Sequence, residues 1–281
     1  MRLAHLHLPD ITSFTRVSNL QQTLTSRLLA HKKLTDANNA SSHAPPDPTI
    51  ITFTPNPVYT TGRRDLPPSN TSNGSGNGSS SSSSTLSLPP ALEPIRPILT
   101  GPTKRAEYHP TLRGGQTTYH GPGQMVAYTI LDLRRLGLTP RCHIRALENS
   151  VVDVLARYNL QGLITSDPGV WVRSKDDDGP AKKITAVGVH LRRNISSYGI
   201  GFNVTEEPMW YFRQIVPCGL EGREATSLEG EGVGGVSVGE VAEGFVGAFV
   251  ERVNRDFACS GGKGTGEKIE GVYSVSEGDL V

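Results

Sequence analysis

The sequence predicts an α+β fold in one domain, because strand-like and helix-like stretches are mixed along its 281 residues without regular alternation. Branched and aromatic residues are concentrated at residues 50–54, 125–133 and 183–191, as is typical of strands. Helical periodicity occurs in only three places, which lie far apart in the sequence. A doubly wound sheet needs a helix after almost every strand, so these helices are too few for that class.

The first helix is predicted at residues 17–29, with Ser18 as a candidate N-cap. Its apolar residues recur at helical spacing and are Val17, Leu20, Leu24 and Leu28. Asparagine, serine and proline then predict a loop over residues 36–48, which the strand at residues 50–54 follows. We expect the sheet to begin at that strand.

Residues 69–87 are dominated by serine, asparagine and glycine, with consecutive serines at residues 79–84. Such a segment cannot bury enough apolar area to offset the entropy of ordering, so we expect a disordered insertion at about residues 67–94. Because the cost of closing a flexible loop grows only logarithmically with its length, one domain can extend across the insertion.

A glycine-rich block follows at residues 113–124, Arg-Gly-Gly-Gln-Thr-Thr-Tyr-His-Gly-Pro-Gly-Gln. Glycine allows unusual backbone dihedrals and a close approach of the backbone to a ligand. The block leads directly into the strand at residues 125–133, which would anchor it to a rigid sheet. We therefore interpret the block as a pocket wall, and an ordinary glycine-rich connection is the less favoured alternative.

Two further helices are predicted from their N-terminal caps. Thr139, followed by proline, begins one of them, and Ser237 with Glu240 forms a capping box for the other. Between these helices, strands at residues 169–172 and 183–191 are expected to form a hairpin with a polar tip.

The C-terminal region is rich in glycine and charged residues from Cys259 onward. The sequence therefore predicts that the domain covers residues 1–258 and that residues 259–281 are a flexible tail.

The composition excludes several classes of protein. Net charge is +1, with 28 lysines and arginines against 27 acids, so no overall basic field indicates nucleic-acid binding. No apolar run approaches the ~20 residues that span a bilayer. Cys142, Cys218 and Cys259 form no Cys-x-x-Cys pair, which argues against a zinc site or a disulfide framework and favours a reducing compartment. The N-terminus has no acid before Asp10 but lacks the length of a clear transit peptide, so targeting stays open.

Cys218 is the candidate nucleophile, because it lies at a Pro-Cys-Gly break where we expect its thiol to be exposed. Cys142 falls in the first turn of a predicted helix, where a free cysteine is usually a small buried hydrophobe, and Cys259 lies in the predicted tail. A thiol attacks only as the thiolate, and its ordinary pKa of about 8.5 leaves little thiolate at neutral pH. Cys218 therefore needs a cation or a base beside it.

Two residues are candidates for that partner. His120 lies in the glycine-rich block, but a loop histidine is as often a hydrogen-bonded wall residue as a base. Lys183 begins an apolar strand that could desolvate its ammonium group, although lysines at strand starts commonly face solvent. By strand alternation Lys183 would share a face with Val187, whereas Ala186 and Gly188 would face the other way. The residues alone leave the choice of partner open.

Small residues at Ala186, Gly188 and 199–201 leave room for a slender apolar group, with tight strand packing as the alternative explanation. A thiol, a cation and small walls together favour acyl transfer. Metal chemistry is disfavoured, because the sequence has no His, Asp and Glu cluster with ligand spacing.

Three separated blocks resemble the lipoyl(octanoyl) transferase family, in matching order and spacing. The blocks are residues 113–124, then residues 169–172, 183–188 and 199–204, then residues 216–219 and 226–228. The family has a biotin/lipoate protein ligase-like fold. The resemblance therefore implies a mixed sheet flanked by helices in a single octanoyltransferase domain.

The resemblance also implies roles for individual residues. Cys218 would accept the acyl group, Lys183 would be its acid/base and thiolate-stabilising partner, and His120 would be a wall residue. The implied substrate-binding wall comprises Arg113, Gly114, Gly115, Gln116, Thr117, Thr118, Tyr119, His120, Ala186, Val187, Gly188, Gly199, Ile200 and Gly201. The chain departs from the family at Tyr198, where the family usually has histidine, and a tyrosine does not titrate near neutrality.

The implied reaction moves an octanoyl group from octanoyl-acyl carrier protein to Cys218. The group then passes to a lysine of apo lipoyl domains, in 2-oxoacid dehydrogenase complexes and the glycine cleavage H protein. No nucleotide, metal or other cofactor is expected. Because such carriers and domains are usually acidic, the arginines at 134–135 and 192–193 are candidate docking residues, with solvated surface charge as the alternative.

Three other functions stay open on the residues. An ATP-dependent lipoate or biotin ligase on the same fold would not need Cys218, and a thioesterase would use water as the acceptor. A lipoyl-domain-binding protein without activity is the third. The serine-rich insertion suggests a eukaryotic source, and eukaryotic members of the family work in mitochondria, so we expect a mitochondrial protein.

Overall fold

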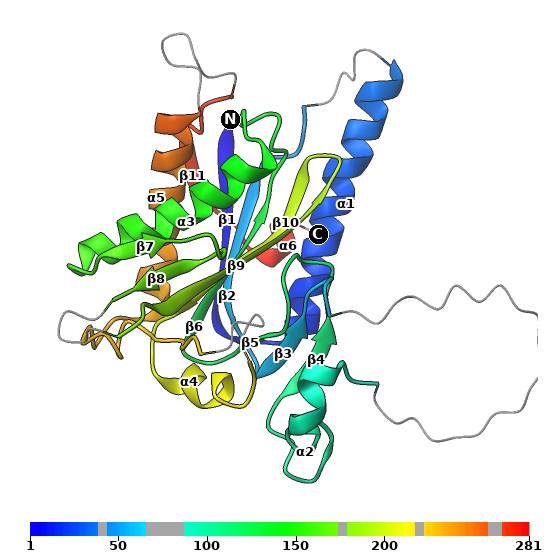
Figure 1. Ribbon diagram of the computed structural model, residues 1–281. Helices are drawn as coiled ribbons and strands as arrows, with labels where there is room; N and C mark the ends of the chain where they lie inside the picture. The colour runs from blue at the N-terminus through cyan, green and yellow to red at the C-terminus, as the bar shows by residue number, and fades with distance from the viewer. Residues whose placement is uncertain (39–43, 66–86, 174–178, 217–221, 258–265, 281) are drawn as a thin grey trace, which may run out of the picture.

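A mixed sheet of eight strands runs through the centre of the described chain, with helices against both of its faces (Figure 1). The computed structural model describes residues 1–38, 44–65, 87–173, 179–216, 222–257 and 266–280. The strand order is β11-β1-β2-β6-β10-β9-β8-β7, and β1 runs parallel to both of its neighbours while the other pairs are antiparallel. The strands are β1 (Arg2–Thr12), β2 (Thr49–Pro55), β6 (Gln124–Ile130), β7 (Gly162–Ile164), β8 (Val170–Val172), β9 (Lys182–Arg192), β10 (Ile195–Asn203) and β11 (Gly271–Ser274).

A second sheet of three strands lies at one end of the large sheet (Figure 1). Its central strand β3 (Val58–Thr61) pairs in parallel with β4 (Glu107–Pro110) and antiparallel with β5 (Thr118–His120). β5 belongs to the glycine-rich block, so part of that block is strand and not loop. A short turn joins β5 to β6, so the block is anchored to both sheets.

Helices α3 (Pro140–Arg157) and α5 (Val238–Asp256) cover one face of the large sheet, and α1 (Phe14–Asn38) covers the other (Figure 1). The predicted N-terminal caps of α3 and α5 are both confirmed. The Thr139 hydroxyl accepts a hydrogen bond from the Cys142 N–H, and Ser237 with Glu240 forms the predicted capping box. The mixed sheet with helices on both faces confirms the predicted α+β class.

The apolar stripe predicted for α1 is buried, but the predicted N-cap is wrong. The helix begins at Phe14, so Ser18 lies inside it. The Asn56 side chain instead accepts the Phe14 N–H at 2.9 Å. Because this cap comes from a distant part of the chain, local sequence carries no sign of it.

The sheet also begins earlier than predicted, at β1. Leu3, Ala4 and Leu6 are buried in it, and the N-terminal ammonium donates to the Lys268 carbonyl at 2.8 Å. Residues 2–12 are therefore part of the folded sheet. They escaped prediction because histidines occupy two of the inner positions of an otherwise alternating strand.

The predicted flexible tail is wrong for residues 266–280. β11 pairs with β1, and a short helix α6 (Glu277–Leu280) follows it. Ile269 is 2% exposed and exchanges two backbone hydrogen bonds of 2.8 Å with the Asn254 side chain. Arg135 forms a bidentate ion pair with Glu267, so this predicted docking arginine holds the C-terminal segment. Cys259 lies outside the described residues.

The predicted insertion ends earlier than residue 94. Residues 90–95 form a 3-10 helix η1 (Pro90–Ile95), which continues into α2 (Arg96–Thr100). Leu92 and Ile95 are buried against β3 and β5 through Tyr59 and Tyr119. Apolar residues after the serine run therefore dock on the small sheet, and residues 66–86 lie outside the described residues. The remaining helix is α4 (Glu207–Phe212).

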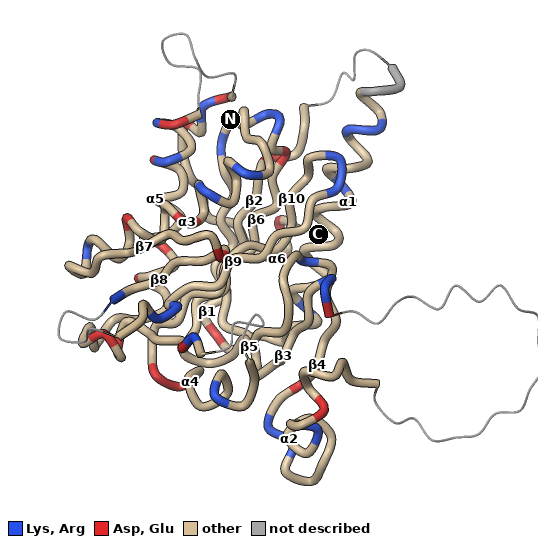
Figure 2. The backbone as a smooth tube through the Cα atoms, viewed as in Figure 1, with Lys and Arg blue, Asp and Glu red and all other residues tan. Residues whose placement is uncertain are grey.

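Charge and hydropathy of the described residues agree with the composition. None of the helices in the described chain combines the length and apolar character needed to cross a membrane. Figure 2 shows basic and acidic positions interspersed along the chain in that view, as a net charge of +1 suggests.

The docked C-terminal segment generates a prediction about stability. Ile269→Ala removes a buried side chain and should lower the free energy of unfolding by about 2–4 kcal/mol. The matched control is Val272→Ala in β11, where the side chain is 42% exposed and the cost should stay below about 1 kcal/mol. Urea denaturation of the two variants measures both values, and an equal small cost would mean that the segment is not docked.

Candidate active site

Two adjoining pockets form a cleft between strands β9 and β10 and the glycine-rich block. We call the first the Lys183 chamber and the second the Arg113 chamber. Their volumes, counted out to the solvent-filled opening of each, are about 430 Å³ and about 480 Å³. The Lys183 chamber is lined by Thr118, Tyr119, His120, Gln124, Trp171, Lys183, Ala186, Gly201, Asn203, Phe212, Arg223, Glu224 and Ala225. The Arg113 chamber is lined by Phe14, Thr60, Thr111, Arg113, Gly114, Gly115, Thr118, His120, Tyr128, Ala186, Val187, Gly188, Tyr198, Gly199, Ile200 and Gly201. The chambers meet at four residues that line both, Thr118, His120, Ala186 and Gly201.

Lys183 shares the first chamber with Ala186, against the expected alternation. Val170 pairs with Thr185 and the next residue of β8 pairs with Lys183, so β9 carries one extra residue at this point. Such a β-bulge shifts the alternation of side chains by one. Lys183 therefore lies on the same side of β9 as the small-residue wall, and the predicted separation of the two faces is wrong.

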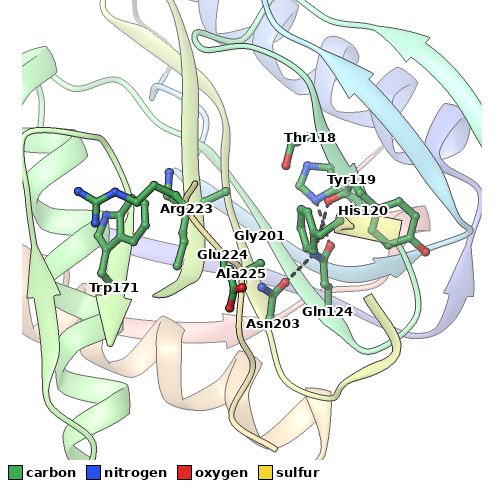
Figure 3. A pocket seen from close by; sticks show the side chains of 13 residues that line it. Thr118, Tyr119, His120, Gln124, Trp171, Gly201, Asn203, Arg223, Glu224 and Ala225 are labelled. Carbon is green, nitrogen blue, oxygen red and sulfur yellow. Dashed lines mark hydrogen bonds between the residues drawn. The ribbon is translucent and has the colours of Figure 1, made fainter. Parts of the chain in front are cut away.

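The Lys183 amino group lies beside a backbone carbonyl and an aromatic ring. Its Nζ donates to the Pro168 carbonyl at 3.1 Å and lies 4.6 Å from the centre of the Trp171 ring. The guanidinium of Arg223 lies 5.4 Å from the same ring, so two cations flank one indole. In Figure 3, Trp171 and Arg223 lie together on the side of the chamber away from His120. Among the described residues, no carboxylate forms an ion pair with Lys183.

A buried carboxylate lies behind this wall. Glu148 accepts the Gly169 N–H at 3.0 Å and pairs with Arg145 at 3.3 Å. Burial raises the pKa of Glu148, while the Gly169 hydrogen bond and the positive charges of Arg145 and Lys183 act in the opposite direction. The chamber therefore has a buried carboxyl group behind the wall that carries its lysine.

The chain after the Pro-Cys-Gly break runs beside Lys183. The Lys183 N–H donates to the Glu224 carbonyl at 2.8 Å, and the Thr226 N–H donates to the Lys183 carbonyl at 3.0 Å. Residues on both sides of that break, Phe212 and Arg223, line the Lys183 chamber. Cys218 itself lies outside the described residues.

His120 forms the boundary between the two chambers and begins a chain of buried hydrogen bonds. Its Nδ1 lies 3.2 Å from the Gln124 Oε1, and Gln124 donates to Asn203 at 2.7 Å (Figure 3). Asn203 in turn donates to the Thr226 carbonyl at 2.8 Å. Burial, and then the charge of Arg113, lower the pKa of His120 to about 3. The imidazole is therefore neutral near pH 7.

Arg113 is buried at the far side of the second chamber. It donates to the Thr60 carbonyl and hydroxyl at 2.9 Å each and to the Gly114 carbonyl at 3.0 Å. These acceptors come from β3 and from the block itself, so the arginine ties the loop to the small sheet. A side chain at Gly188 would have its Cβ 3.1 Å from the Arg113 Cδ, so a small residue keeps this part of the chamber open.

Residues 62–65 hold the glycine-rich block from behind. A Cβ at Gly62 would lie 2.2 Å from the Gly115 carbonyl oxygen, so only glycine permits this close approach. Asp65 accepts the Thr117 N–H at 2.6 Å and the Thr117 hydroxyl at 2.7 Å. In the described structure, Gln116 and Thr117 contact Asp65 and do not line the chambers, unlike the other predicted wall residues.

Sequence reasoning missed several lining residues. Trp171, Gln124 and Asn203 lie within the blocks that the resemblance used, but nothing in those blocks marked their contacts. A tryptophan and two amides at the ends of apolar strands were the available signals. Across the described ranges, no group of three His, Cys, Asp or Glu side chains could hold a metal ion.

The buried histidines predict a loss of stability in acid. Burial lowers the pKa of His120 from 6.5 to about 3, and the pKa values of His5 and His143 to about 4. The unfolded chain therefore binds more protons between about pH 6.5 and pH 4. Stability is fully present above about pH 6.5 and is lost as the pH falls, by up to about 1.4 kcal/mol per pH unit for each histidine.

Urea denaturation at a series of pH values between about 7 and 5 measures this slope. His143→Gln places an amide that does not titrate beside Thr129, the hydrogen-bond partner of the imidazole. The variant should show a shallower slope than the wild type. Parallel stability curves for the two proteins would contradict a neutral buried imidazole.

The contacts of Asp65 predict that it orders the glycine-rich block. Asp65→Ala leaves the Thr117 N–H without its acceptor, so the exchange rate of that amide hydrogen should rise at least about tenfold. Asp65→Asn keeps one acceptor oxygen and should give a smaller rise. Hydrogen exchange monitored by NMR measures both rates, and unchanged protection of Thr117 would assign the order of the block to other contacts.

Comparison with known families is consistent with this geometry. A model of the lipoyl protein ligase A/B catalytic domain matches residues 101–250. A probable octanoyltransferase of Schizosaccharomyces pombe is 37% identical over 224 residues, which are 79% of this chain and 83% of the yeast protein. The octanoyltransferase of Paracoccus denitrificans is 47% identical over 131 residues, 44% of this chain and 60% of the bacterial protein.

The human mitochondrial octanoyl-[acyl-carrier-protein]:protein N-octanoyltransferase is 43% identical over 149 residues, 52% of this chain and 61% of the human protein. The matched region thus spans about three fifths of the bacterial and human relatives.

Solved structures share the fold at low sequence identity. A bi-partite lipoate protein ligase from Thermoplasma acidophilum superposes with a TM-score of 0.55 at 13% identity, over 99% of this chain and 89% of that one. LipL1 of Plasmodium falciparum, solved with lipoate, has a TM-score of 0.59 at 8% identity, over 100% and 68% of the chains. These structures show the fold alone. The family match and the yeast relative show that the chain belongs to the lipoyl protein ligase A/B family, among its octanoyltransferases.

Proposed function

We propose that this protein is an octanoyltransferase that carries an octanoyl group from octanoyl-acyl carrier protein to apo lipoyl domains through a thioester on Cys218. One observation carries the proposal. The bulge in β9 brings Lys183 into the same chamber as the small-residue wall, and the chain on both sides of the Pro-Cys-Gly break lines that chamber. A nucleophile, a cation and a slender cavity are the groups that acyl transfer needs.

In the first half-reaction the Cys218 thiolate attacks the carbonyl carbon of the octanoyl thioester. The bond from that carbon to the carrier's sulfur breaks, and the carrier leaves as a thiol after taking up a proton. Lys183 stabilises the thiolate as a cation and moves the proton between the two sulfurs. The product is an octanoyl-Cys218 thioester, with no oxidant or nucleotide consumed.

In the second half-reaction the amine of a lysine on a lipoyl domain attacks that thioester. An amide bond forms, the bond to the Cys218 sulfur breaks, and the proton lost by the amine returns to the sulfur by way of Lys183. The acceptors are the apo lipoyl domains of 2-oxoacid dehydrogenase complexes and the glycine cleavage H protein. The name of the human relative specifies octanoyl-acyl carrier protein, and this supports the proposed donor.

His120 acts as a wall residue in this mechanism. Its neutral ring, its bond to Gln124 and its place between the chambers suit a group that shapes the cavity and does not accept a proton near pH 7. We place the reaction in mitochondria. The support is the human relative and a Xenopus tropicalis relative, 43% and 38% identical, which are both named as mitochondrial.

Intact-mass spectrometry after mixing with octanoyl-carrier protein tests the dyad. The wild type should gain one octanoyl group, Cys218→Ala should gain none, and Lys183→Met should form the adduct about 10²–10⁴-fold more slowly. Lys182→Met is the matched control, since Lys182 pairs with Glu224 on the neighbouring segment, and it should behave like the wild type.

A second assay on the same proteins tests the second half-reaction and distinguishes a transferase from a ligase or a thioesterase. Octanoyl-lipoyl domain should accumulate without ATP, and free octanoate should stay a minor product. Product that requires ATP and survives Cys218→Ala would identify a ligase instead, and free octanoate as the main product would identify a thioesterase.

A further inference from the structure

Tyr198 forms a partition between the Arg113 chamber and a third cavity beneath helix α1. It lines both spaces. We call this third space the outer cavity, and its volume, counted out to the solvent-filled opening, is about 670 Å³. Its other lining residues include Gln21, Gln22, Leu29, Leu112 and Arg192. One aromatic side chain therefore lies between the far end of the cleft and a larger open space.

The backbone at Tyr198 is in a conformation that tyrosine rarely adopts. Its φ is 60°, in the left-handed region, which costs energy for a bulky residue and commonly marks a functional constraint. In β10, Ile200 and Phe202 point into the core beneath α3 and α5. Strict alternation would send Tyr198 to that core too, but its ring instead packs with the core residues beneath α1.

Several contacts hold the ring in this position. The Tyr198 ring meets the Tyr128 ring edge-on, with the ring centroids 5.4 Å apart. The backbone N–H of Tyr198 donates to the Gln21 side chain at 2.5 Å. The hydroxyl accepts the Leu112 N–H at 3.5 Å. The partition is thus tied to β6, to α1 and to the chain just before the glycine-rich block.

The walls change in size at Tyr198. Gly201 pairs with Ala186 and Gly199 pairs with Gly188, so a channel of small residues runs along β9 and β10 from the chamber boundary. Tyr198 is the next residue, three positions from Gly201, which is about 10 Å along a strand. A medium-length acyl chain that enters at Lys183 and passes His120 would end against this ring.

We propose that Tyr198 is a specificity-determining residue that sets the maximum acyl chain length by closing the channel from the outer cavity. The inference rests on the proposed function, since it assumes that the acyl chain occupies the Arg113 chamber. A longer chain meets the ring and would have to displace it from Tyr128. Removal of the ring joins the channel to the outer cavity and admits longer chains.

The first experiment compares octanoyl-, dodecanoyl- and tetradecanoyl-carrier protein as donors, by the kcat/KM of acyl transfer. Tyr198→Gly removes the ring and suits the left-handed backbone, so the dodecanoyl to octanoyl ratio should rise about tenfold or more over that of the wild type. Tyr198→Phe keeps the ring and should keep the wild-type ratio. Gln22→Ala alters the wall of the outer cavity but not the Arg113 chamber, and it should keep both the ratio and the octanoyl rate.

Tyr198→Asn is the second variant, because asparagine tolerates the left-handed conformation and also lacks the ring. It should raise the dodecanoyl to octanoyl ratio in the same way, so it tests the proposal even if Tyr198→Gly folds poorly. A ratio that stays at the wild-type value in a folded Gly or Asn variant would overturn the proposal. A rise that Gln22→Ala reproduces would also overturn it, since the partition would then not be the cause.

A binding measurement separates this proposal from the proposed function. Titration of Cys218→Ala with free octanoate and dodecanoate, by calorimetry and with and without Tyr198→Gly, reports chain-length preference without any transfer step. A shifted preference with no transfer in the wild type would support the partition and reject the octanoyltransferase mechanism. Normal transfer in the wild type with an unshifted preference would reject the partition alone.

Discussion

The β-bulge at the start of β9 is the feature on which the cleft depends. A regular strand would send Lys183 to the opposite face from Ala186 and leave the small-residue wall without this lysine. The extra residue lets Lys183 share a chamber with Ala186, while Ile184 and Thr185 stay fully buried. Pairing with residues 224–226 then holds the bulged lysine against the segment that follows the Pro-Cys-Gly break. Sheet geometry thus brings together groups that are far apart in the sequence.

A buried polar chain links the two halves of the cleft. Hydrogen bonds run from His120 through Gln124 and Asn203 to the carbonyl of Thr226. Thr226 belongs to the segment that pairs with Lys183. Buried polar groups are costly unless they are paired, so each member holds its neighbours in one arrangement. The glycine-rich block and the segment near the proposed nucleophile are thereby fixed relative to each other.

Local signals predicted the elements whose causes are local. Thr139 and the Ser237 capping box marked two helices, and the stripe from Val17 to Leu28 marked the third. Three of the errors involve partners from elsewhere in the chain. The cap of α1 comes from Asn56, the C-terminal segment is held by β1 and Asn254, and the bulge appears only when β8 is aligned with β9. Single-sequence patterns carry no record of such pairings.

The same limit applies to the site. The glycine block, the small walls and Lys183 were visible because each is a local departure from core or surface composition. The neutrality of His120 required knowledge of its burial and of the charge of Arg113. The position of Tyr198 required its backbone angle, since alternation alone would bury it beneath α3 and α5. The left-handed backbone of this one bulky residue, next to a channel of small ones, is therefore the observation on which the proposed partition rests.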